Sequence, residues 1–413
     1  MTYKLNLVAF IIPAFFIFLA LEYIAATRKK KKHLFNYESS ISSISIGIAE
    51  RMLNLLITGS FYSFYKYLFE NFAAWQIPNA WWVWVVLLMV TDLVWYWYHR
   101  LGHEINIFWG AHIVHHQSEE FNYTVSARIT TVQAIVRNLF WCLLPLAGFQ
   151  PAMVTAILVV HGTYSFFTHT QVIGKLGWLE HILITPSHHG VHHASNPKYL
   201  DKNYGDIFVF WDKLFGTFQK EEDDEKPVYG ITHPLKSHSF LWQHFHYYAE
   251  LWEACRRSKN AGAALKLIFG RPDLVDASIR PELEKKLLPR KLPFRSTFRL
   301  KAYLNVQVLL CLVALFFFTL YFNQLSTTDK WFAVAGILIT LINCGAMLEQ
   351  QKWVYQVEVV RLLLLSTYAS VLEESMGLFI VSLLAILILS TFDFLEEKYY
   401  QFVYDTEDAA PGN

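Results

Sequence analysis

Long apolar runs, separated by short polar segments, make up most of the chain. An apolar stretch needs about 20 residues to cross the roughly 30 Å of hydrocarbon in a bilayer. Nine runs approach this length, at Leu5–Ala26, Ile41–Phe69, Trp81–Tyr98, Thr131–Leu146, Pro151–Thr168, Ala302–Phe322, Trp331–Leu348, Val357–Leu372 and Met376–Phe392. The pattern therefore predicts an all-α integral membrane protein, a multi-span helical bundle of about nine spans.

The stretch between the fifth and sixth runs, residues 169–300, is polar and irregular. It carries an acidic run at 221–225 and prolines at 227, 234, 272, 281, 289 and 293. Proline interrupts long helices, so we expect a cytosolic cap with modest secondary structure. The predicted parts are N-terminal anchor helices at 1–79, a histidine-motif core at 80–220, a cytosolic cap segment at 221–300, C-terminal transmembrane helices at 301–395 and a cytosolic tail at 396–413.

A basic run follows the first span at once, from Arg28 to Lys32. A cleaved signal peptide would carry its charge before the apolar run, so this span is predicted to be a retained anchor. Basic residues next to a span favour the cytoplasmic side. With the amino terminus outside, the count of spans places the end of the third span, the end of the fifth span and the carboxyl tail in the cytoplasm.

The composition agrees with a chain that is largely solvated by lipid. Hydrophobic residues make up 54% and charged residues only 17%, whereas soluble domains carry about 25% charged residues. The net charge of +1 and the lack of a basic domain argue against a nucleic-acid partner. The four cysteines show no paired spacing, which argues against a disulfide framework or a thiolate metal site.

Histidines gather in three runs beside the predicted spans. The runs are His99 and His103; His112, His115 and His116; and His188, His189, His192 and His193. Spacings of three and four place side chains on one face of a helix, and neutral imidazole is a common ligand of transition metals. These nine of the 17 histidines predict a histidine-rich cap over a dinuclear metal site, where the membrane meets water.

Two further histidines lie in or at the end of the fifth span. His169 is near the predicted cytoplasmic boundary, where it would be able to join the cluster. His161 is two turns deeper, and a metal ligand and a histidine bonded to a neighbouring helix are equally good interpretations. The remaining histidines lack this spacing and are expected to be ordinary surface or core residues. They are His33, His181, His233, His238, His244 and His246.

Three polar residues are the candidates for a role beside the metal. Glu104 follows His103 directly, as a ligand or a supporting carboxylate. Asp92 lies two turns before His99, within range to accept a ring N–H through a partner or water. Asn203 is expected to orient rings from the cap. Further residues of the cap share that expectation, namely Asn196, Asp206 and Asp212, although the segment around Asp212 is equally well explained as a structural turn.

The ordered histidine motifs resemble those of the fatty acid hydroxylase and sterol desaturase superfamily. The series HxxxH, HxxHH and HxxHH is followed by Asp-Lys-Asn-Tyr-Gly at 201–205 and Trp-Asp-Lys-Leu-Phe-Gly-Thr-Phe at 211–218. The resemblance covers about residues 80–220. Details favour the alkylglycerol monooxygenase branch: Gly-His-Glu at 102–104, Phe-Phe-Thr-His-Thr at 166–170, Thr-Pro-Ser-His-His-Gly-Val-His-His at 185–193 and the apolar carboxyl-terminal part.

The resemblance implies a membrane-bound non-haem di-iron oxygenase with two iron ions. O₂ would be the oxidant, a lipid from the bilayer the substrate, and the carbon next to the ether oxygen of an alkylglycerol the position that is hydroxylated. An electron donor is also implied, and in this branch it is tetrahydrobiopterin, although no residue pattern identifies a pterin pocket. The host membrane would be a bacterial inner membrane or the endoplasmic reticulum. The oligomeric state is not indicated.

Other functions compete with this interpretation. A sterol or fatty acyl hydroxylase or desaturase would use the same histidines, and their spacing does not decide between these reactions. A histidine-lined metal transporter would hold its ligands near the bilayer midplane on broken helices, whereas these runs lie beyond span ends. A haem protein needs single facing histidines, and three clusters oversupply it.

Overall fold

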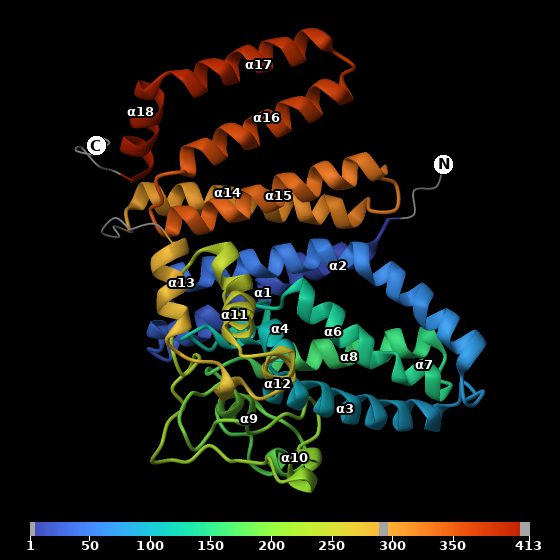
Figure 1. Cartoon of the computed structure of the whole chain (residues 1–413). Coiled ribbons are helices and arrows are strands. Elements are labelled where there is room, and N and C mark those ends of the chain that lie inside the picture. The colour runs from blue at the N-terminus through green and yellow to red at the C-terminus, as the bar shows by residue number, and fades with distance from the viewer. Residues whose placement is uncertain (1–4, 289–295, 405–413) are drawn as a thin grey trace. The chain divides into compact units, whose positions relative to one another are not determined.

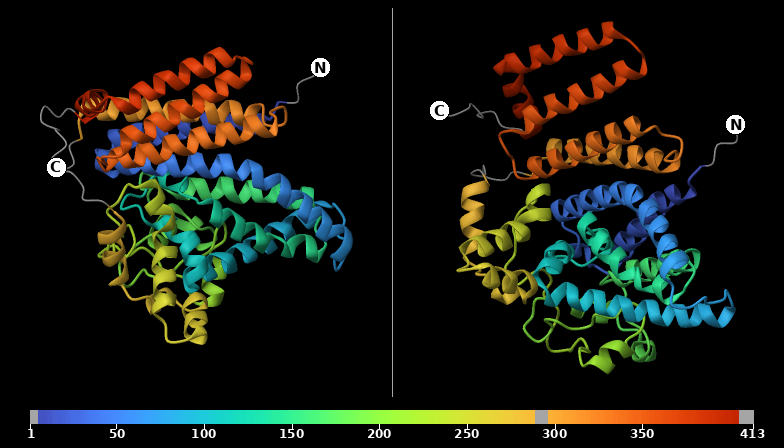
Figure 2. Two further views of the ribbon diagram at one scale, coloured as in Figure 1. Left: turned by 45° about the horizontal axis from the view of Figure 1, so that its top comes forward. Right: turned by 45° about the vertical axis from the view of Figure 1, so that its right-hand side comes forward.

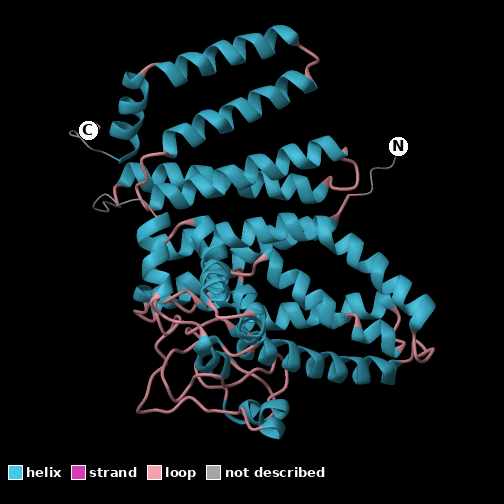
Figure 3. Ribbon diagram, viewed as in Figure 1, coloured by secondary structure: helices cyan, strands magenta, loops and turns pink. Residues whose placement is uncertain are grey.

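The computed structural model describes residues 5–288 and 296–404, and its regular secondary structure is helical, with long loops around α9 and α10 (Figures 1 and 3). Within these residues there is no strand, and only two isolated β-bridges form, Leu183 with Phe208 and Ala194 with Tyr229. The all-α prediction is confirmed. Parts of the predicted division lie outside the described residues, namely 1–4, 289–295 and 405–413.

The chain separates into two compact units. The histidine unit comprises residues 15–236 and 244–284, and the C-terminal unit comprises 1–14, 237–243 and 285–413. The predicted division into five parts stays a prediction. Its expected tail begins inside a helix that continues to Tyr404.

The histidine unit contains most of the helices. They are α1 (Ile11–Arg28, from residue 15 on), α2 (Tyr37–Phe72), α3 (Trp81–Glu104), α4 (Asn106–His116), α5 (Tyr123–Ser126), α6 (Thr131–Trp141), α7 (Leu143–Ala147), α8 (Pro151–Thr168), α9 (Pro186–His192), α10 (Phe210–Phe215), α11 (Phe240–Arg257, after its first turn), α12 (Ala261–Phe269) and most of α13 (Ile279–Leu287). Short 3₁₀ turns lie at Leu7–Phe10, Lys32–Leu34, Gly177–His181 and Pro272–Leu274. Helix α3 packs against α4, α6 and α8.

Local sequence explains the boundaries next to the histidines. Pro151 opens α8, where its missing N–H costs no hydrogen bond. Gly148 ends α7 with φ of +108°, and a Cβ there would lie 2.0 Å from the Trp75 carbonyl oxygen. Glycine is therefore required at this turn. Ile105 is extended between α3 and α4, so the chain bends and brings the rings of the two helices together.

Among the described residues, seven helices are long and apolar enough to cross a membrane. They are Leu7–Arg28, Tyr37–Phe72, Trp81–Glu104, Pro151–Thr168, Phe298–Leu320, Thr327–Leu348 and Val354–Leu372. Met376–Thr391 and Asp393–Tyr404, bent by 80°, make an eighth if they count as one span. The fourth of the nine predicted spans, Thr131–Leu146, is instead a shorter apolar stretch, because it breaks at Cys142 into α6 and α7. Residues 131–147 fall short of the roughly 20 that a span needs.

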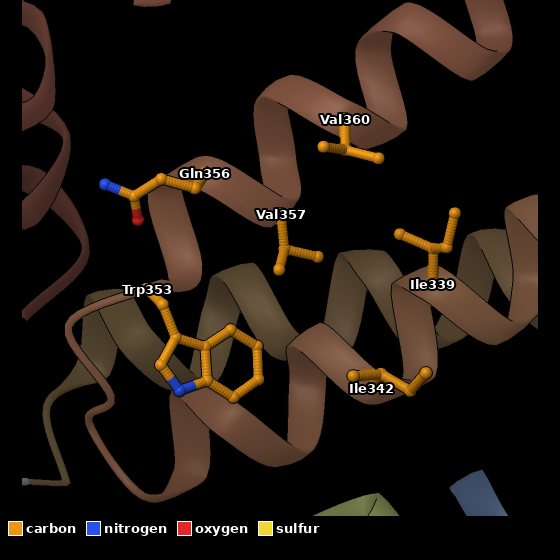
Figure 4. Close-up of a pocket in the computed structure, with 6 residues that line it drawn as sticks. All are labelled: Ile339, Ile342, Trp353, Gln356, Val357 and Val360. Atoms are coloured by element: carbon orange, nitrogen blue, oxygen red, sulfur yellow. The ribbon is translucent and has the colours of Figure 1, made fainter. Parts of the chain in front are cut away.

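Five complete helices lie in the described part of the C-terminal unit. They are α14 (Phe298–Leu320), α15 (Thr327–Leu348), α16 (Val354–Leu372), α17 (Met376–Thr391) and α18 (Asp393–Tyr404). Figure 2 shows α14 and α15 side by side. Ser326 and Asp329 form a capping box that starts α15. An apolar groove between α15 and α16 appears in Figure 4, and none of its lining residues is a histidine.

Candidate metal centre

Nine histidines of the histidine unit form two adjacent groups that are able to hold metal ions. Site 1 contains His99, His103, His112, His116 and His192, and site 2 contains His115, His169, His189 and His193. Within each group, one nitrogen of every ring lies within 4.8 Å of the others. Every ring is at most 9% exposed. The stacked rings of His116 and His193, with centroids 4.3 Å apart, join the two sites.

Four elements carry these rings. Helix α3 supplies His99 and His103, four residues apart on one face. Helix α4 directs His112 and His116 into site 1 and the intervening His115 into site 2. The other two elements are α9, with His193 directly after it, and the end of α8, where His169 is the first residue past the helix.

The rings point their Nε2 atoms at one another. In site 1, His112 Nε2 lies 3.1 Å from the Nε2 atoms of both His99 and His116. In site 2, His169 Nε2 lies 3.1 Å from His115 Nε2 and 3.0 Å from His189 Nε2, and His193 follows at 3.2 Å from His189. The open coordination positions of several rings thus converge on two points.

The opposite nitrogen of several rings faces a backbone carbonyl. His99 Nδ1 lies 2.9 Å from the Tyr204 oxygen, His192 Nδ1 2.9 Å from the Lys202 oxygen, and His169 Nδ1 2.7 Å from the Ser165 oxygen. A carbonyl oxygen only accepts hydrogen bonds, so Nδ1 carries the proton and Nε2 of the neutral ring carries a lone pair. These carbonyls therefore set the tautomer that a metal ligand needs.

Two lone pairs 3.1 Å apart do not form a hydrogen bond, and they repel each other unless a cation lies between them. Metal–imidazole bonds are about 2.0–2.1 Å long, so two such nitrogens are about 2.9 Å apart at a right angle and about 3.3 Å apart at the tetrahedral angle. The observed Nε2 separations of 3.0–3.2 Å lie between these values. The donor set fits a metal ion in each site.

Gln133 holds the ring of His112 in the same way. Its Nε2 lies 2.8 Å from His112 Nδ1, while its Oε1 has no hydrogen-bond partner among the described residues. The two ends of an amide are distinguished only by their partners. Turning the amide over places Oε1 on His112 Nδ1–H, and the NH2 group then takes the place that Oε1 had. Gln133 is then the acceptor that orients this ring.

Burial keeps the rings outside the spans neutral. It lowers the pKa of six of them well below 6.5, and neighbouring rings lower it further: His112, His115, His116, His189, His192 and His193. Burial is also the main cause that lowers the pKa of His169 to about 4. At neutral pH these rings therefore present lone pairs without first losing a proton.

Comparisons with known proteins agree with this geometry. The family model of fatty acid hydroxylase matches residues 84–217, which include all nine rings. Alkylglycerol monooxygenase from Homo sapiens is 33% identical over 366 residues, or 85% of this chain and 80% of that protein. The protein of that name from Danio rerio is 32% identical over 336 residues, or 79% of this chain and 74% of its own length.

The chain belongs to the fatty acid hydroxylase family, in its alkylglycerol monooxygenase branch. Members outside the branch match less of it: ornithine lipid hydroxylase OlsE from Rhizobium tropici is 29% identical over 158 residues, or 38% of this chain and 47% of that protein. No solved structure matches the chain. Family membership and the apolar spans make it a multi-pass membrane oxidoreductase of the lipid-hydroxylating type.

Two histidines that the sequence offered as ligands lie outside both sites of this family member. His188 packs against Phe218, and its Nδ1 lies 3.3 Å from the Leu183 oxygen. His161 lies instead in a third group, with Asp92 and Asp206. The nine rings of sites 1 and 2 are thus the eight other histidines of the three runs together with His169.

The three expected polar residues also lie outside the two sites. Glu104 accepts a hydrogen bond from Arg100 Nε at 3.0 Å and is partly exposed. Asp92 accepts the backbone N–H groups of Ile207 and Phe208. Asn203, with φ of +56°, donates to the His188 and Gln219 carbonyls and accepts from the Gln219 N–H, so it fixes the loop that leads to Tyr204.

The residues that sequence reasoning missed act on ring orientation. Gln133 holds His112, and the carbonyls of Lys202 and Tyr204 hold His192 and His99. The loop that carries these carbonyls is in turn fixed by Asp212, which accepts the N–H groups of Tyr204 and Gly205 at 2.7 and 2.8 Å. Asp212 thus belongs to a structural turn and, through the backbone of Tyr204, also supports the ring of His99. The two expectations for Asp212 describe this one arrangement.

Proposed function

We propose that this protein is a di-iron alkylglycerol monooxygenase that uses O₂ to hydroxylate the ether-adjacent carbon of an alkylglycerol. The observation that carries the proposal is the pair of converging imidazole groups, in which Nε2 atoms face one another at 3.0–3.2 Å. Such groups suit two cations. The relatives that span most of the chain are named alkylglycerol monooxygenases, and this supports the choice of substrate.

In this proposal, sites 1 and 2 hold one iron ion each. The iron pair, when bound, supplies the binding of O₂ and its activation for attack on a C–H bond. The chain's own residues hold and orient the ligands: the Tyr204 and Lys202 carbonyls and Gln133 fix three rings of site 1, and the Ser165 carbonyl fixes His169 of site 2. Burial of all nine rings excludes bulk water from the place where the oxidant forms.

The substrate is proposed to enter from the bilayer. Helix α3 carries His99 and His103 at the end of a membrane-length helix, and α8 carries His169 at the end of another. A lipid is then able to keep its alkyl chain among the spans while its ether carbon reaches the metal sites. We assign the histidines to the cytoplasmic face, because the basic run from Arg28 to Lys32 follows the first span.

The electron donor that we propose is tetrahydrobiopterin, on the strength of the branch alone. The host membrane is either a bacterial inner membrane or the endoplasmic reticulum. The predicted core of residues 80–220 is the oxygenase part of the chain in this proposal, since it contains both metal sites and the family match.

The main alternative is a sterol or fatty acyl hydroxylase or desaturase. One such relative, Delta(7)-sterol 5(6)-desaturase ERG3B from Gibberella zeae, is 25% identical over 37% of the chain. A match over 85% of the chain cannot be contained in residues 1–284, so the alkylglycerol monooxygenases share a large part of the helices beyond residue 285. That extent favours the ether lipid as substrate.

The test is a reaction with purified protein in lipid nanodiscs, supplied with iron(II), O₂ and tetrahydrobiopterin. The substrate is a 1-O-alkylglycerol, and the matched control is the 1-acylglycerol of equal chain length, which lacks the ether carbon. We expect fatty aldehyde from the ether only, and none from a His116→Ala variant. Oxidation of a sterol or an acyl chain, with the ether lipid left intact, contradicts the proposed substrate.

A further inference from the structure

A second polar cluster is buried next to the metal sites and belongs to neither of them. Asp92 of α3 and His161 of α8 are fully buried, and Asp206, from the loop between α9 and α10, is 5% exposed. His161 Nδ1 lies 2.6 Å from Asp206 Oδ2 and 3.8 Å from Asp92 Oδ1. The Trp95 ring stacks on His161, with centroids 5.9 Å apart and planes 15° apart.

The distances favour hydrogen bonds and ion pairing over a third metal. Ligand atoms on one ion are about 2.9 Å apart at a right angle, and the 2.6 Å between His161 Nδ1 and Asp206 is shorter. Both oxygens of Asp92 also already accept a backbone N–H, from Ile207 at 2.9 Å and Phe208 at 3.1 Å. The cluster therefore connects three segments of the chain through polar contacts that depend on direction.

Each of these segments also holds a ligand or the partner of a ligand. Asp92 precedes His99 by two helical turns, about 10 Å along one face of α3. His161 precedes His169 by about two turns of α8. Asp206 lies two residues after Tyr204, whose carbonyl oxygen accepts the N–H of His99. The cluster thus connects the α3 rings of site 1 with the α8 ring of site 2.

Within the ligand set, His99 and His169 are connected only indirectly, for example through α4, where His112 Nε2 lies 3.1 Å from His99 Nε2 and His115 Nε2 lies 3.1 Å from His169 Nε2. Helices α4 and α9 each give rings to both sites, but they do not carry His99 or His169. The apolar contacts of α3 and α8, which include Val94 and Ile157, are not directional and tolerate sliding. A hydrogen-bonded cluster fixes register in a way that such packing does not.

We propose that Asp92, His161 and Asp206 are positioning residues that hold the α3 ligands of site 1 and the α8 ligand of site 2 in register. The inference rests on the proposed function, because it requires a metal in each site. Without the cluster, the nine ligands are retained, but His99 and His169 lose their fixed places relative to each other. The two ions should then bind less tightly and at a changed separation.

The test uses the full-length protein loaded with Mn(II), whose electron paramagnetic resonance spectrum reports the spin coupling between two nearby ions. The variants are His161→Leu, Asp206→Asn, which keeps the shape of the side chain, and His161→Gln, which keeps an N–H donor toward Asp206. His246→Leu is the matched control, because His246 is equally buried in the histidine unit and outside both sites.

Wild type should bind two Mn(II) ions per chain and show coupled spins. His161→Leu should bind at least one ion about 10-fold more weakly and show altered spin coupling. Asp206→Asn should show a smaller change in both affinity and coupling. In His161→Gln, both should return part of the way to the wild-type values. His246→Leu should match wild type. Unchanged affinity and an unchanged spectrum in Asp206→Asn would overturn the inference, whether or not His161→Leu folds. If wild type itself binds fewer than two ions, the proposed di-metal function fails first.

Discussion

Two buried polar clusters, one in each unit, differ in the atoms that face each other. In the C-terminal unit, Glu358 Oε1 accepts hydrogen bonds from Tyr303 at 2.6 Å and Asn343 at 2.8 Å, and its other oxygen pairs with Arg361. Donors meet acceptors there, so α14, α15 and α16 are tied together with no added ion. In the histidine unit, ring nitrogens face other ring nitrogens: His99 Nε2 lies 3.1 Å from His112 Nε2, and His169 Nε2 lies 3.1 Å from His115 Nε2.

The comparison shows that buried polarity alone does not identify a site. Buried polar groups call for a structural or functional explanation, and both clusters are buried. The C-terminal cluster is a structural link because its charges are paired and both Glu358 oxygens have a partner, although Asn343 Oδ1 and Arg361 Nε have no hydrogen-bond partner among the described residues. The histidine cluster is a candidate metal site because the ring nitrogens of each of its two groups lie within 4.8 Å of one another. Substitutions should therefore affect the two clusters in opposite ways.

The largest effect is expected from His116→Ala in the histidine cluster. It removes a ring that belongs to site 1 and stacks on His193 of site 2. We expect metal content to fall below two ions per chain and activity to reach background, a larger loss than the roughly 100-fold that follows removal of an outer hydrogen bond. Metal analysis and turnover measure both. His33→Ala, at an exposed position, is the control and should behave as wild type.

Arg361→Met should have the opposite profile. It leaves the buried Glu358 carboxylate without its cation, which costs about 3–5 kcal/mol of unfolding free energy. The metal content of the folded protein should stay at two ions. Arg256→Met is the control, because Arg256 is exposed and its partner Glu253 keeps a second cation, Arg257; exposed ion pairs contribute about 0–1 kcal/mol. Loss of metal in Arg361→Met, at full folding, would refute the division of roles between the clusters.

Gln133→Leu should produce a smaller effect within the histidine cluster. The leucine leaves His112 Nδ1–H without an acceptor, and loss of such a partner weakens metal binding by about 10- to 100-fold. A metal titration of the purified protein measures the change. Gln133→Glu keeps an acceptor oxygen and should stay close to wild type. Equal affinities in the leucine and glutamate variants would show that this contact does not orient the ring.

The smallest effect is expected at His188. Its ring packs against Phe218 and lies outside both sites, so His188→Ala should keep two metal ions and lose only packing. His189→Ala, one position along, removes a ring of site 2 and should lower metal content. The two variants test whether metal binding depends on where a ring points in the fold or only on its place in the histidine run. Equal metal loss in both would return His188 to the ligand set.

Much of the histidine cluster was predictable, because spacings of three and four on a helix bring rings to one face. The same geometry explains His188: it directly precedes His189 and so points about 100° away around α9. The spacing does not say which ring joins which site, and α4 divides its three rings between them. That division depends on where α8 and α9 meet α4, which is a tertiary fact.

The partners of the rings were largely beyond prediction. Every residue has a carbonyl, so no residue type marks Tyr204 or Lys202 as the acceptor for His99 or His192. Asp92 was expected near a ring N–H, and the structure gives it backbone partners and a place 3.8 Å from His161. Among the spans, the prediction for Thr131–Leu146 was wrong because the helix breaks at Cys142. The sequence does mark this break, because Pro145 has no N–H to donate to the carbonyl of Trp141 four residues earlier.

The most direct test is the metal content of the purified wild-type protein after loading with excess iron(II) and removal of unbound metal. The arrangement of nine rings in two groups predicts two iron ions per chain, with no haem absorbance, and both ions lost or weakened in His116→Ala. One ion or none per chain, in protein that is shown to be folded, would contradict the claim that these imidazoles form a dinuclear site.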